Sequence, residues 1–169
     1  MIKTTMRFFV LEVLVFCIAL IIGYTVTANE QDTYISEEIK AYCVEIGEEY
    51  GVCPELLMAM IEAESSGNTK AENGDCKGLM QVSQKWHVDR MERLCVSDLF
   101  DPYGNILVAT DYLVELFEKH GDLPLVLDIY NGNSKAYEHY ENGTLSAYAE
   151  KIMNRSYELE EVHGKHNYE

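Results

Sequence analysis

The sequence predicts a mainly helical fold built as one domain. Apolar residues recur at intervals of three and four positions in successive segments, and Gly or Pro separates one segment from the next. No segment shows the strict alternation of apolar and polar residues that is typical of half-buried strands. With 169 residues and a hydrophobic fraction of 47%, the chain suits one folded domain plus a targeting segment.

The first two expected helices cover residues 36–50 and 54–65. The first has acidic side chains in its opening turn and ends at Gly51, and the second begins at Pro54, which suits a first helical turn. Their apolar faces are formed by Ile39, Tyr42, Cys43, Ile46 and Tyr50 in the first helix and by Leu56, Leu57, Met60 and Ile61 in the second.

Further helices are expected over residues 83–94, 102–120, 124–130 and 144–160, with a brief segment over 134–141 between the last two. The longest follows Asp101-Pro102 and ends at His120-Gly121, a basic residue and then a glycine cap. A short β-hairpin is expected in the polar stretch between Gly67 and Gly78. The apolar positions are Trp86, Met91 and Leu94 in the helix over 83–94, and Leu145, Tyr148, Ala149, Ile152 and Leu159 in the last helix.

The N-terminus has the pattern of a signal peptide or a membrane anchor. Lys3 and Arg7 precede an apolar run over 8–24, and Val26-Thr27-Ala28 follows with small residues at a peptidase site. The run is intermediate in length between a signal core and a membrane span, so both readings of residues 1–28 stay open. We expect residues 29–34 to form a linker, 35–162 the domain and 163–169 a polar tail. The domain is expected outside the cytoplasm, secreted or anchored to the outer face of the membrane.

The charge balance argues against polyanionic partners. The chain carries 29 acidic and 13 basic residues and a net charge of −16. Such a surface repels nucleic acids and anionic lipids, so we expect no nucleic-acid partner, and membrane contact only through the N-terminal segment. We also expect a monomer. We expect no cofactor.

Four cysteines lie in the expected domain: Cys43, Cys53, Cys76 and Cys95. An oxidising compartment predicts at least one disulfide, with the pairing left open. A metal site is disfavoured, because no two of these cysteines have C-x-x-C spacing, and the helical pair His163 and His166 lacks a third ligand.

Glu64 is the leading candidate for chemistry. Leu57, Met60 and Ile61 lie seven, four and three positions before it, so all four share one helix face. A carboxyl group at the end of a buried face loses hydration, and this loss raises its pKa as a general acid requires. The alternative is a helix-end glutamate that reaches solvent.

Four motifs in order around Glu64 resemble one enzyme family. They are Gly51-Val52-x-Pro54-Glu55-Leu56-Leu57 with Ala63-Glu64-Ser65-Ser66-Gly67-Asn68, then Gly78-Leu79-Met80-Gln81, then Leu99-Phe100-Asp101-Pro102 with Asn105-Ile106, and finally Tyr130-Asn131-Gly132. Over residues 35–155 the chain resembles the lytic transglycosylases of the soluble-transglycosylase (SLT) type, which share the fold of goose-type lysozyme. The resemblance implies a lysozyme-like fold and peptidoglycan strands as the partner.

The resemblance also implies site residues. Glu64 is the sole acid/base: it protonates the bond between N-acetylmuramic acid and N-acetylglucosamine, and then takes the proton of the muramic 6-hydroxyl as an anhydro ring closes. Substrate-binding roles fall on Ser65, Ser66, Met80, Gln81, Tyr130, Asn131 and Tyr148. Two places depart from the family pattern: Ile129 precedes the Tyr-Asn pair where Ala is usual, and Leu145-Ser146-Ala147 precedes Tyr148.

Three alternatives remain open. A hydrolytic muramidase would pair Glu64 with a second carboxylate, for which Glu72, Asp75 and Asp101 are candidates. A cysteine peptidase would use Cys76 with His87 or His120. The last alternative is a cell-wall-binding module without catalysis, in which Tyr130 and Tyr148 are ordinary core tyrosines.

Overall fold

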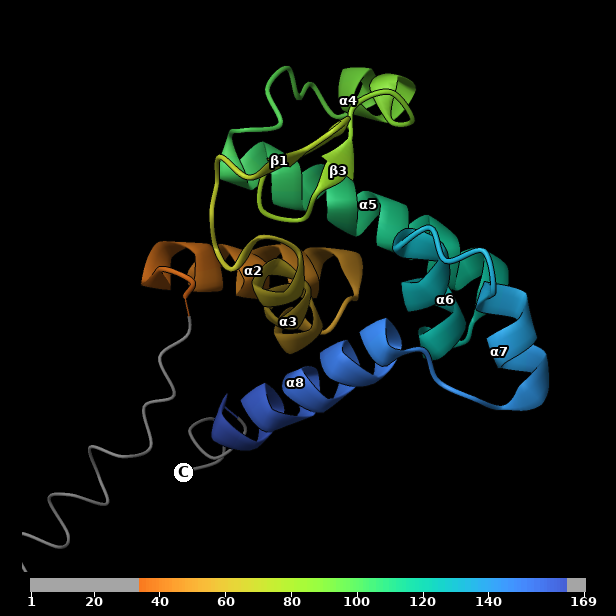
Figure 1. The fold of residues 1–169 in the computed structure, drawn as a ribbon. Coiled ribbons are helices and arrows are strands. Elements are labelled where there is room, and N and C mark those ends of the chain that lie inside the picture. The colour runs from red at the N-terminus through yellow and green to blue at the C-terminus, as the bar shows by residue number, and fades with distance from the viewer. Residues whose placement is uncertain (1–33, 164–169) are drawn as a thin grey trace, which may run out of the picture. The chain divides into compact units, whose positions relative to one another are not determined.

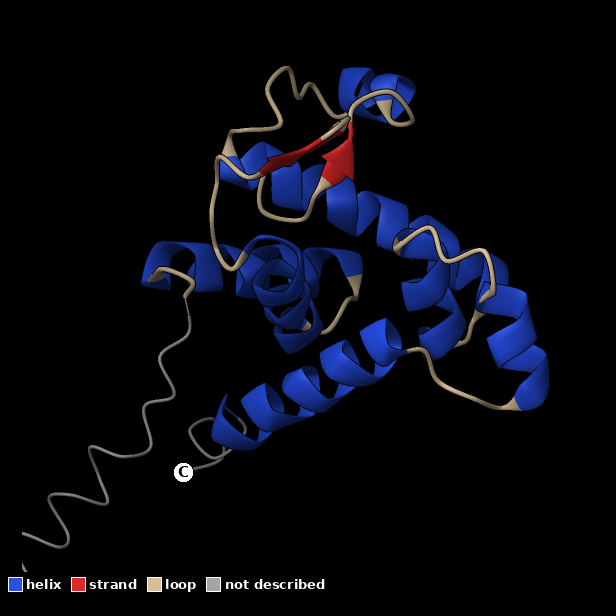
Figure 2. Ribbon diagram, viewed as in Figure 1, coloured by secondary structure: helices blue, strands red, loops and turns tan. Residues whose placement is uncertain are grey.

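The structure is a computed structural model that describes residues 34–163, within a compact unit that begins at Tyr34. Helices dominate this part, as the sequence predicts, and a small sheet accompanies them (Figures 1 and 2). The predicted leader over 1–28, most of the predicted linker and the tail beyond His163 lie outside the described residues. Between residues 34 and 163, no helix combines the length and the apolar character needed to cross a membrane.

Seven helices form between residues 34 and 163. Six of them overlap predicted helices, and the seventh forms in the segment over 134–141, for which no helix is predicted. Three of the helices begin at a capping side chain: Ser36, Asp101 and Asp122 each accept a backbone N–H of the first turn. The helices are α2 (Glu37–Tyr50), α3 (Pro54–Ser65), α4 (Val88–Arg93), α5 (Pro102–His120), α6 (Leu123–Tyr130), α7 (Ala136–Asn142) and α8 (Ala147–His163).

The predicted hairpin is present and gains a third strand. Strands β1 (Glu72–Asn73), β2 (Cys76–Lys77) and β3 (Val82–Ser83) form an antiparallel sheet in the order β1-β2-β3, and β3 packs against α5 (Figure 2). The prediction of a helix from residue 83 is therefore wrong at its start. Ser83 pairs with Cys76 in the sheet, and Trp86 is 77% exposed instead of facing the core.

Helix α3 lies at the centre of the core. Its residues 56–61 are all buried, because α2 packs on one side of it and α8 on another, and α5 then packs on α2 (Figure 1). Full burial of each large apolar side chain contributes about 1.5–3 kcal/mol. A helix packed on several sides holds its end at a defined place, and Glu64 lies at that end.

Two further expectations differ from the structure. Leu145 is exposed and precedes α8, because that helix begins at Ala147. The expected disulfide is absent: Cys43, Cys53, Cys76 and Cys95 are all free. Cys43 lies in the core on α2, whereas Cys53 and Cys95 are exposed at the ends of other helices.

Candidate active site

Glu64 meets a tyrosine from the last helix. The Tyr148 hydroxyl near the start of α8 donates a hydrogen bond to Oε1 of Glu64, and both side chains are half-buried. The pairing follows from the packing of α8 along α3. Because Oε1 accepts this bond, Oε2 is the oxygen that carries the proton when Glu64 is neutral.

The environment of Glu64 favours its protonated form. Burial raises the pKa of this carboxyl, and the Tyr148 hydrogen bond and the charge of Lys151 offset only part of that rise. Burial and the neighbouring Glu64 charge also raise the pKa of Tyr148, so its phenol stays protonated and remains a donor. The pKa of Glu64 is thus shifted in the direction that a general acid requires.

The Gly78–Gln81 loop is held against α5 by one buried side chain. Asn105 of α5 accepts from the Met80 N–H at 2.8 Å, and its amide donates to the carbonyls of Lys77 and Leu99 at 2.7 and 2.9 Å. At Gly78, where φ is +74°, a Cβ atom would lie 2.2 Å from the Leu99 carbonyl oxygen. Only glycine fits this approach.

Tyr130 joins this loop from the end of α6. Its hydroxyl donates to the Met80 carbonyl at 2.8 Å, while the Met80 side chain is fully buried. The structure therefore differs from the expectation that Met80 lines the cleft, because that side chain belongs to the core. Burial and the Glu64 charge raise the pKa of Tyr130, which places its phenol within the electrostatic reach of the acid.

Gln81 presents an acceptor and not a donor. Its side-chain amide donates to the carbonyls of Ala71 and Gly78, at 3.2 and 3.0 Å. The side-chain carbonyl oxygen is the remaining polar atom, and Gln81 lines the cavity beside Tyr130.

Three predicted residues are not brought to the acid. The Ser65 hydroxyl donates to the Ile61 carbonyl at 3.1 Å and so turns back along α3. Ser66 is exposed in the left-handed conformation that ends α3, and Asn131 is exposed after α6. No hydrogen bond joins any of these three side chains to Glu64.

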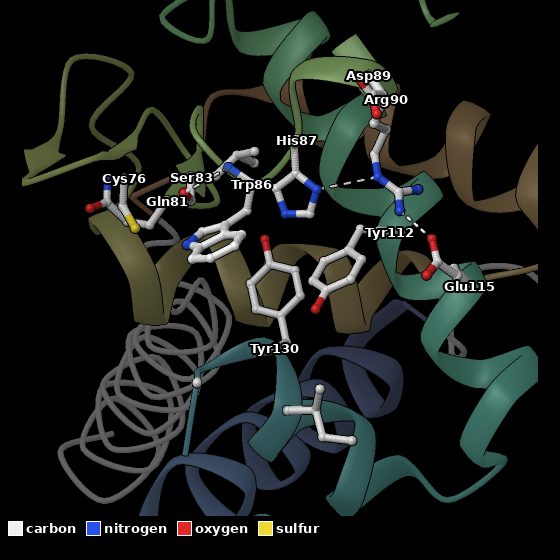
Figure 3. Close-up of a pocket in the computed structure, with 13 residues that line it drawn as sticks. Cys76, Gln81, Ser83, Trp86, His87, Asp89, Arg90, Tyr112, Glu115 and Tyr130 are labelled. Carbon is white, nitrogen blue, oxygen red and sulfur yellow. Dashed lines mark hydrogen bonds and ion pairs between the residues drawn. The ribbon is translucent and has the colours of Figure 1, made fainter. Parts of the chain in front are cut away.

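A cavity of about 580 Å³ extends from Gln81 and Tyr130 toward α4 (Figure 3). Glu64 does not line it. Glu64 lies beside the cavity, because its charge raises the pKa of Tyr130 and of Cys76, and both of these residues line the cavity. The lining residues are Cys76, Gln81, Val82, Ser83, Trp86, His87, Asp89, Arg90, Tyr112, Glu115, Ile129, Tyr130 and Gly132.

Aromatic rings form a row along this cavity. His87 and Tyr112 have ring centroids 4.6 Å apart, and Tyr112 and Tyr130 are 5.7 Å apart. Arg90 lies over Tyr112 and forms ion pairs with Asp111 and Glu115. The sequence motifs assign no site role to Trp86, Tyr112 or Arg90. The wrong helix start hid Trp86, and Tyr112 lies outside the recognised motifs.

The acids proposed as a second carboxylate have structural partners or lie outside the cavity. Asp75 accepts from the Ser83 hydroxyl and the Lys85 N–H, and Asp101 caps α5. Glu72 is exposed on β1. Asp89, which the sequence analysis did not single out, is exposed and lines the cavity.

A cysteine nucleophile and a metal centre find little support in this part of the chain. Burial, followed by the charges of Asp75 and Glu64, raises the pKa of Cys76, which disfavours the thiolate. Within residues 34–163, no three His, Cys, Asp or Glu side chains gather where they could hold a metal ion.

Comparison with known proteins points to one family. A family model described as "Transglycosylase SLT domain" matches residues 41–153. A protein named "Transglycosylase" from Enterobacteria phage PRD1 is 30% identical over 87 residues, which are 51% of this chain. The aligned region spans 31% of the length of that curated relative.

Proposed function

Because the chain belongs to the SLT transglycosylase family, we propose that it is a peptidoglycan lytic transglycosylase with Glu64 as its only acid/base. The observation that carries this proposal is the state of Glu64: a half-buried carboxyl with a raised pKa, bonded by Tyr148, whose charge acts on Tyr130 and Cys76 in the lining of the cavity. The family membership supports the substrate class, and the single acid is supported by the structural partners of Asp75 and Asp101.

In the proposed reaction, Glu64 first acts as an acid. Oε2–H protonates the oxygen that links C1 of N-acetylmuramic acid to O4 of N-acetylglucosamine, and the C1–O4 bond breaks. The N-acetylglucosamine part leaves with that proton as its 4-hydroxyl. Tyr148 stabilises the carboxylate that forms, because it already donates to Oε1.

Glu64 then acts as a base. The muramic 6-hydroxyl attacks C1, its proton returns to Glu64, and a 1,6-anhydro ring closes. No water is consumed, so one carboxyl group suffices. A hydrolase would add water and need a second carboxylate near the first.

Product analysis tests this proposal. Purified peptidoglycan is digested with the full chain, and the fragments are examined by mass spectrometry. We expect muramic ends one water lighter than reducing ends. Reducing ends as the only products, together with complete loss of activity in Asp89→Asn, would instead establish a muramidase that uses the one free acid of the cavity.

We also propose that the domain acts outside the cytoplasmic membrane. Lys3, Arg7 and the apolar run over 8–24 support export, and peptidoglycan lies outside that membrane. Protease added to intact spheroplasts should degrade the domain of an anchored form. A cleaved form should appear in the medium, and a chain that stays protected inside the cell would contradict the proposal.

A further inference from the structure

His87 has a defined tautomer. Arg90 Nε donates to Nδ1 of His87 at 3.3 Å. A guanidinium N–H can only donate, so Nδ1 must be the unprotonated nitrogen, and the hydrogen of the neutral ring is on Nε2. Burial, followed by the charge of Arg90, lowers the pKa of His87 against the opposing effects of Glu115 and Asp111, which keeps the ring neutral. In Figure 3 this second nitrogen faces the space between Trp86, Tyr112 and Tyr130.

The rings of Trp86 and Tyr112, beside His87, add an apolar surface and further hydrogen-bonding groups. Trp86 is 77% exposed at the cavity, and Lys85 lies 5.0 Å from its ring centre. Within residues 34–163, the Tyr112 hydroxyl, the Trp86 indole N–H and His87 Nε2 have no recorded hydrogen-bond partner. We call Trp86, His87 and Tyr112 together the aromatic arm of the cavity. Flat apolar faces combined with free donors suit a sugar ring with a carbonyl substituent.

The charged residues that line the cavity favour an uncharged ligand over an anionic one. Among the cavity-lining residues one is basic, Arg90, and two are acidic, Asp89 and Glu115. Arg90 is already engaged by Asp111 and Glu115. A peptide-bearing muramic residue would therefore find no free cation among the residues that line the cavity, and the cation beside the arm, Lys85, lies over the Trp86 ring. An uncharged N-acetylated sugar meets no repulsion.

We propose that the aromatic arm binds an N-acetylglucosamine ring, with His87 Nε2–H donating to the acetamido oxygen and Trp86 covering an apolar sugar face. This inference rests on the proposed function, which makes a glycan strand the substrate, and adds to it the identity of the sugar and the residue that selects it. His87 is then a specificity-determining residue that takes no part in proton transfer.

The protein carries its own reporter of this site, because Trp86 is the only tryptophan in the chain. The full chain is prepared as Glu64→Gln, so that binding is measured without turnover, and its Trp emission is titrated with chitotetraose and with cellotetraose. Chitotetraose should give a saturable change. Cellotetraose has the same backbone without acetamido groups and should bind at least about tenfold more weakly, since a donor would lose its partner.

Variants of His87 test the donor. His87→Phe keeps a ring beside Tyr112 and should weaken chitotetraose binding about tenfold, whereas His87→Gln, which retains an N–H, should lose less. His120→Phe, on α5 outside the cavity, is the matched control and should leave affinity unchanged. A circular-dichroism melt of each variant confirms that it is folded.

Three results would overturn the inference: an emission that chitotetraose does not change, equal affinity for cellotetraose, or unchanged chitotetraose affinity in a folded His87→Phe protein. Cleavage by the wild-type chain is measured separately on peptidoglycan. If the chain cuts peptidoglycan but chitotetraose does not change its Trp emission, then only the inferred N-acetylglucosamine site at the aromatic arm is refuted. A chain that binds chitotetraose through His87 but leaves peptidoglycan intact refutes only the proposed reaction.

Discussion

The Tyr148 hydroxyl donates a hydrogen bond to Oε1 of Glu64 across 84 positions of the chain. Glu64 receives this bond at the end of α3, on a helix whose apolar residues are fully buried. Burial and the tyrosine act on the carboxyl in opposite directions: the first favours the acid, the second the carboxylate. The balance between them is what a group that must both give and take a proton needs.

Removal of the phenol should change both rate and pH dependence. Tyr148→Phe takes away a donor to the carboxylate, so the pKa of Glu64 should rise further and the alkaline limb of the pH–rate profile should move to higher pH. At acidic pH the rate should fall roughly tenfold, because the carboxylate formed in the transition state loses a charged hydrogen bond. The measurement is peptidoglycan clearance from pH 4 to about 9.

The matched control is Tyr157→Phe, on the same helix but 64% exposed. Its profile should coincide with that of the wild type. An alkaline limb that moves to lower pH in Tyr148→Phe would show that the tyrosine does not stabilise the carboxylate.

Glu64→Gln should separate activity from stability. Activity should fall about a thousandfold, in the range for loss of a general acid. A carboxyl with a raised folded-state pKa costs stability once it ionises, so the neutral variant should be at least as stable as the wild type at pH 7, and its advantage should grow as the pH rises through that pKa. Urea unfolding at several pH values measures this.

Glu62→Gln is the counterpart on the same helix. Glu62 forms an ion pair with Arg155 at 2.6 Å, with both side chains partly buried. Its loss should destabilise the fold by about 1 kcal/mol and leave the chemistry in place. Equal inactivity of both variants would mean that Glu64 has no special role.

The Gly78–Gln81 loop allows a comparison of two glycines. Gly74 and Gly78 both have positive φ, but a Cβ on Gly74 meets nothing within 4 Å, whereas on Gly78 it meets Leu99 and Asn105. Gly74→Ala should cost about 1–2 kcal/mol from the left-handed backbone alone. Gly78→Ala should cost on the order of 4 kcal/mol or more and abolish activity. Denaturant unfolding measures both, and similar losses would contradict the close approach.

Asp128 should stabilise the region behind Tyr130 in a pH-dependent way. It is 2% exposed on α6, and its Oδ2 lies 2.8 Å from Nδ1 of His139 on α7. Burial raises its pKa, but Ser146, His139 and Asn133 together outweigh burial and hold the pKa below its usual value.

A lowered pKa means that the carboxylate stabilises the fold above the unfolded-state pKa of about 3.9, and that this contribution disappears as the pH falls through the folded-state value. Asp128→Asn should therefore be less stable than the wild type at pH 7, and the difference should shrink below about pH 4. Thermal melts from pH 3 to about 7 test this. A difference that is constant with pH would contradict it.

Much of the fold follows from local sequence signals. Pro54, Asp101-Pro102, Gly51 and Gly121 mark helix ends through their own backbone preferences, and these ends agree with the structure. The pKa shift of Glu64 was also accessible, because helical spacing alone places it on the buried face. These features depend on residues close together in the chain.

Features that depend on distant contacts were missed. Strand β3 has two residues and forms because Ser83 pairs with Cys76, which no periodicity reveals. The motif predicts that Met80 lines the cleft. In the structure the Met80 N–H donates to the buried Asn105 side chain, and the Met80 side chain lies in the core. The aromatic arm joins Trp86 and His87 of the loop before α4 with Tyr112 of α5, beside Tyr130 of α6, and only the packing of those elements brings them together.

The distance in sequence between Glu64 and Tyr148 bears on the moment at which this protein becomes active during its synthesis. A growing chain contains the acid long before it contains α8, so the nascent protein has the Glu64 carboxyl without Tyr148. The hydrogen bond between Tyr148 and Glu64 can form only after the last helix has been synthesised and has packed on α3. The order of translation thus places this hydrogen bond among the contacts that cannot form until synthesis of the chain is nearly complete.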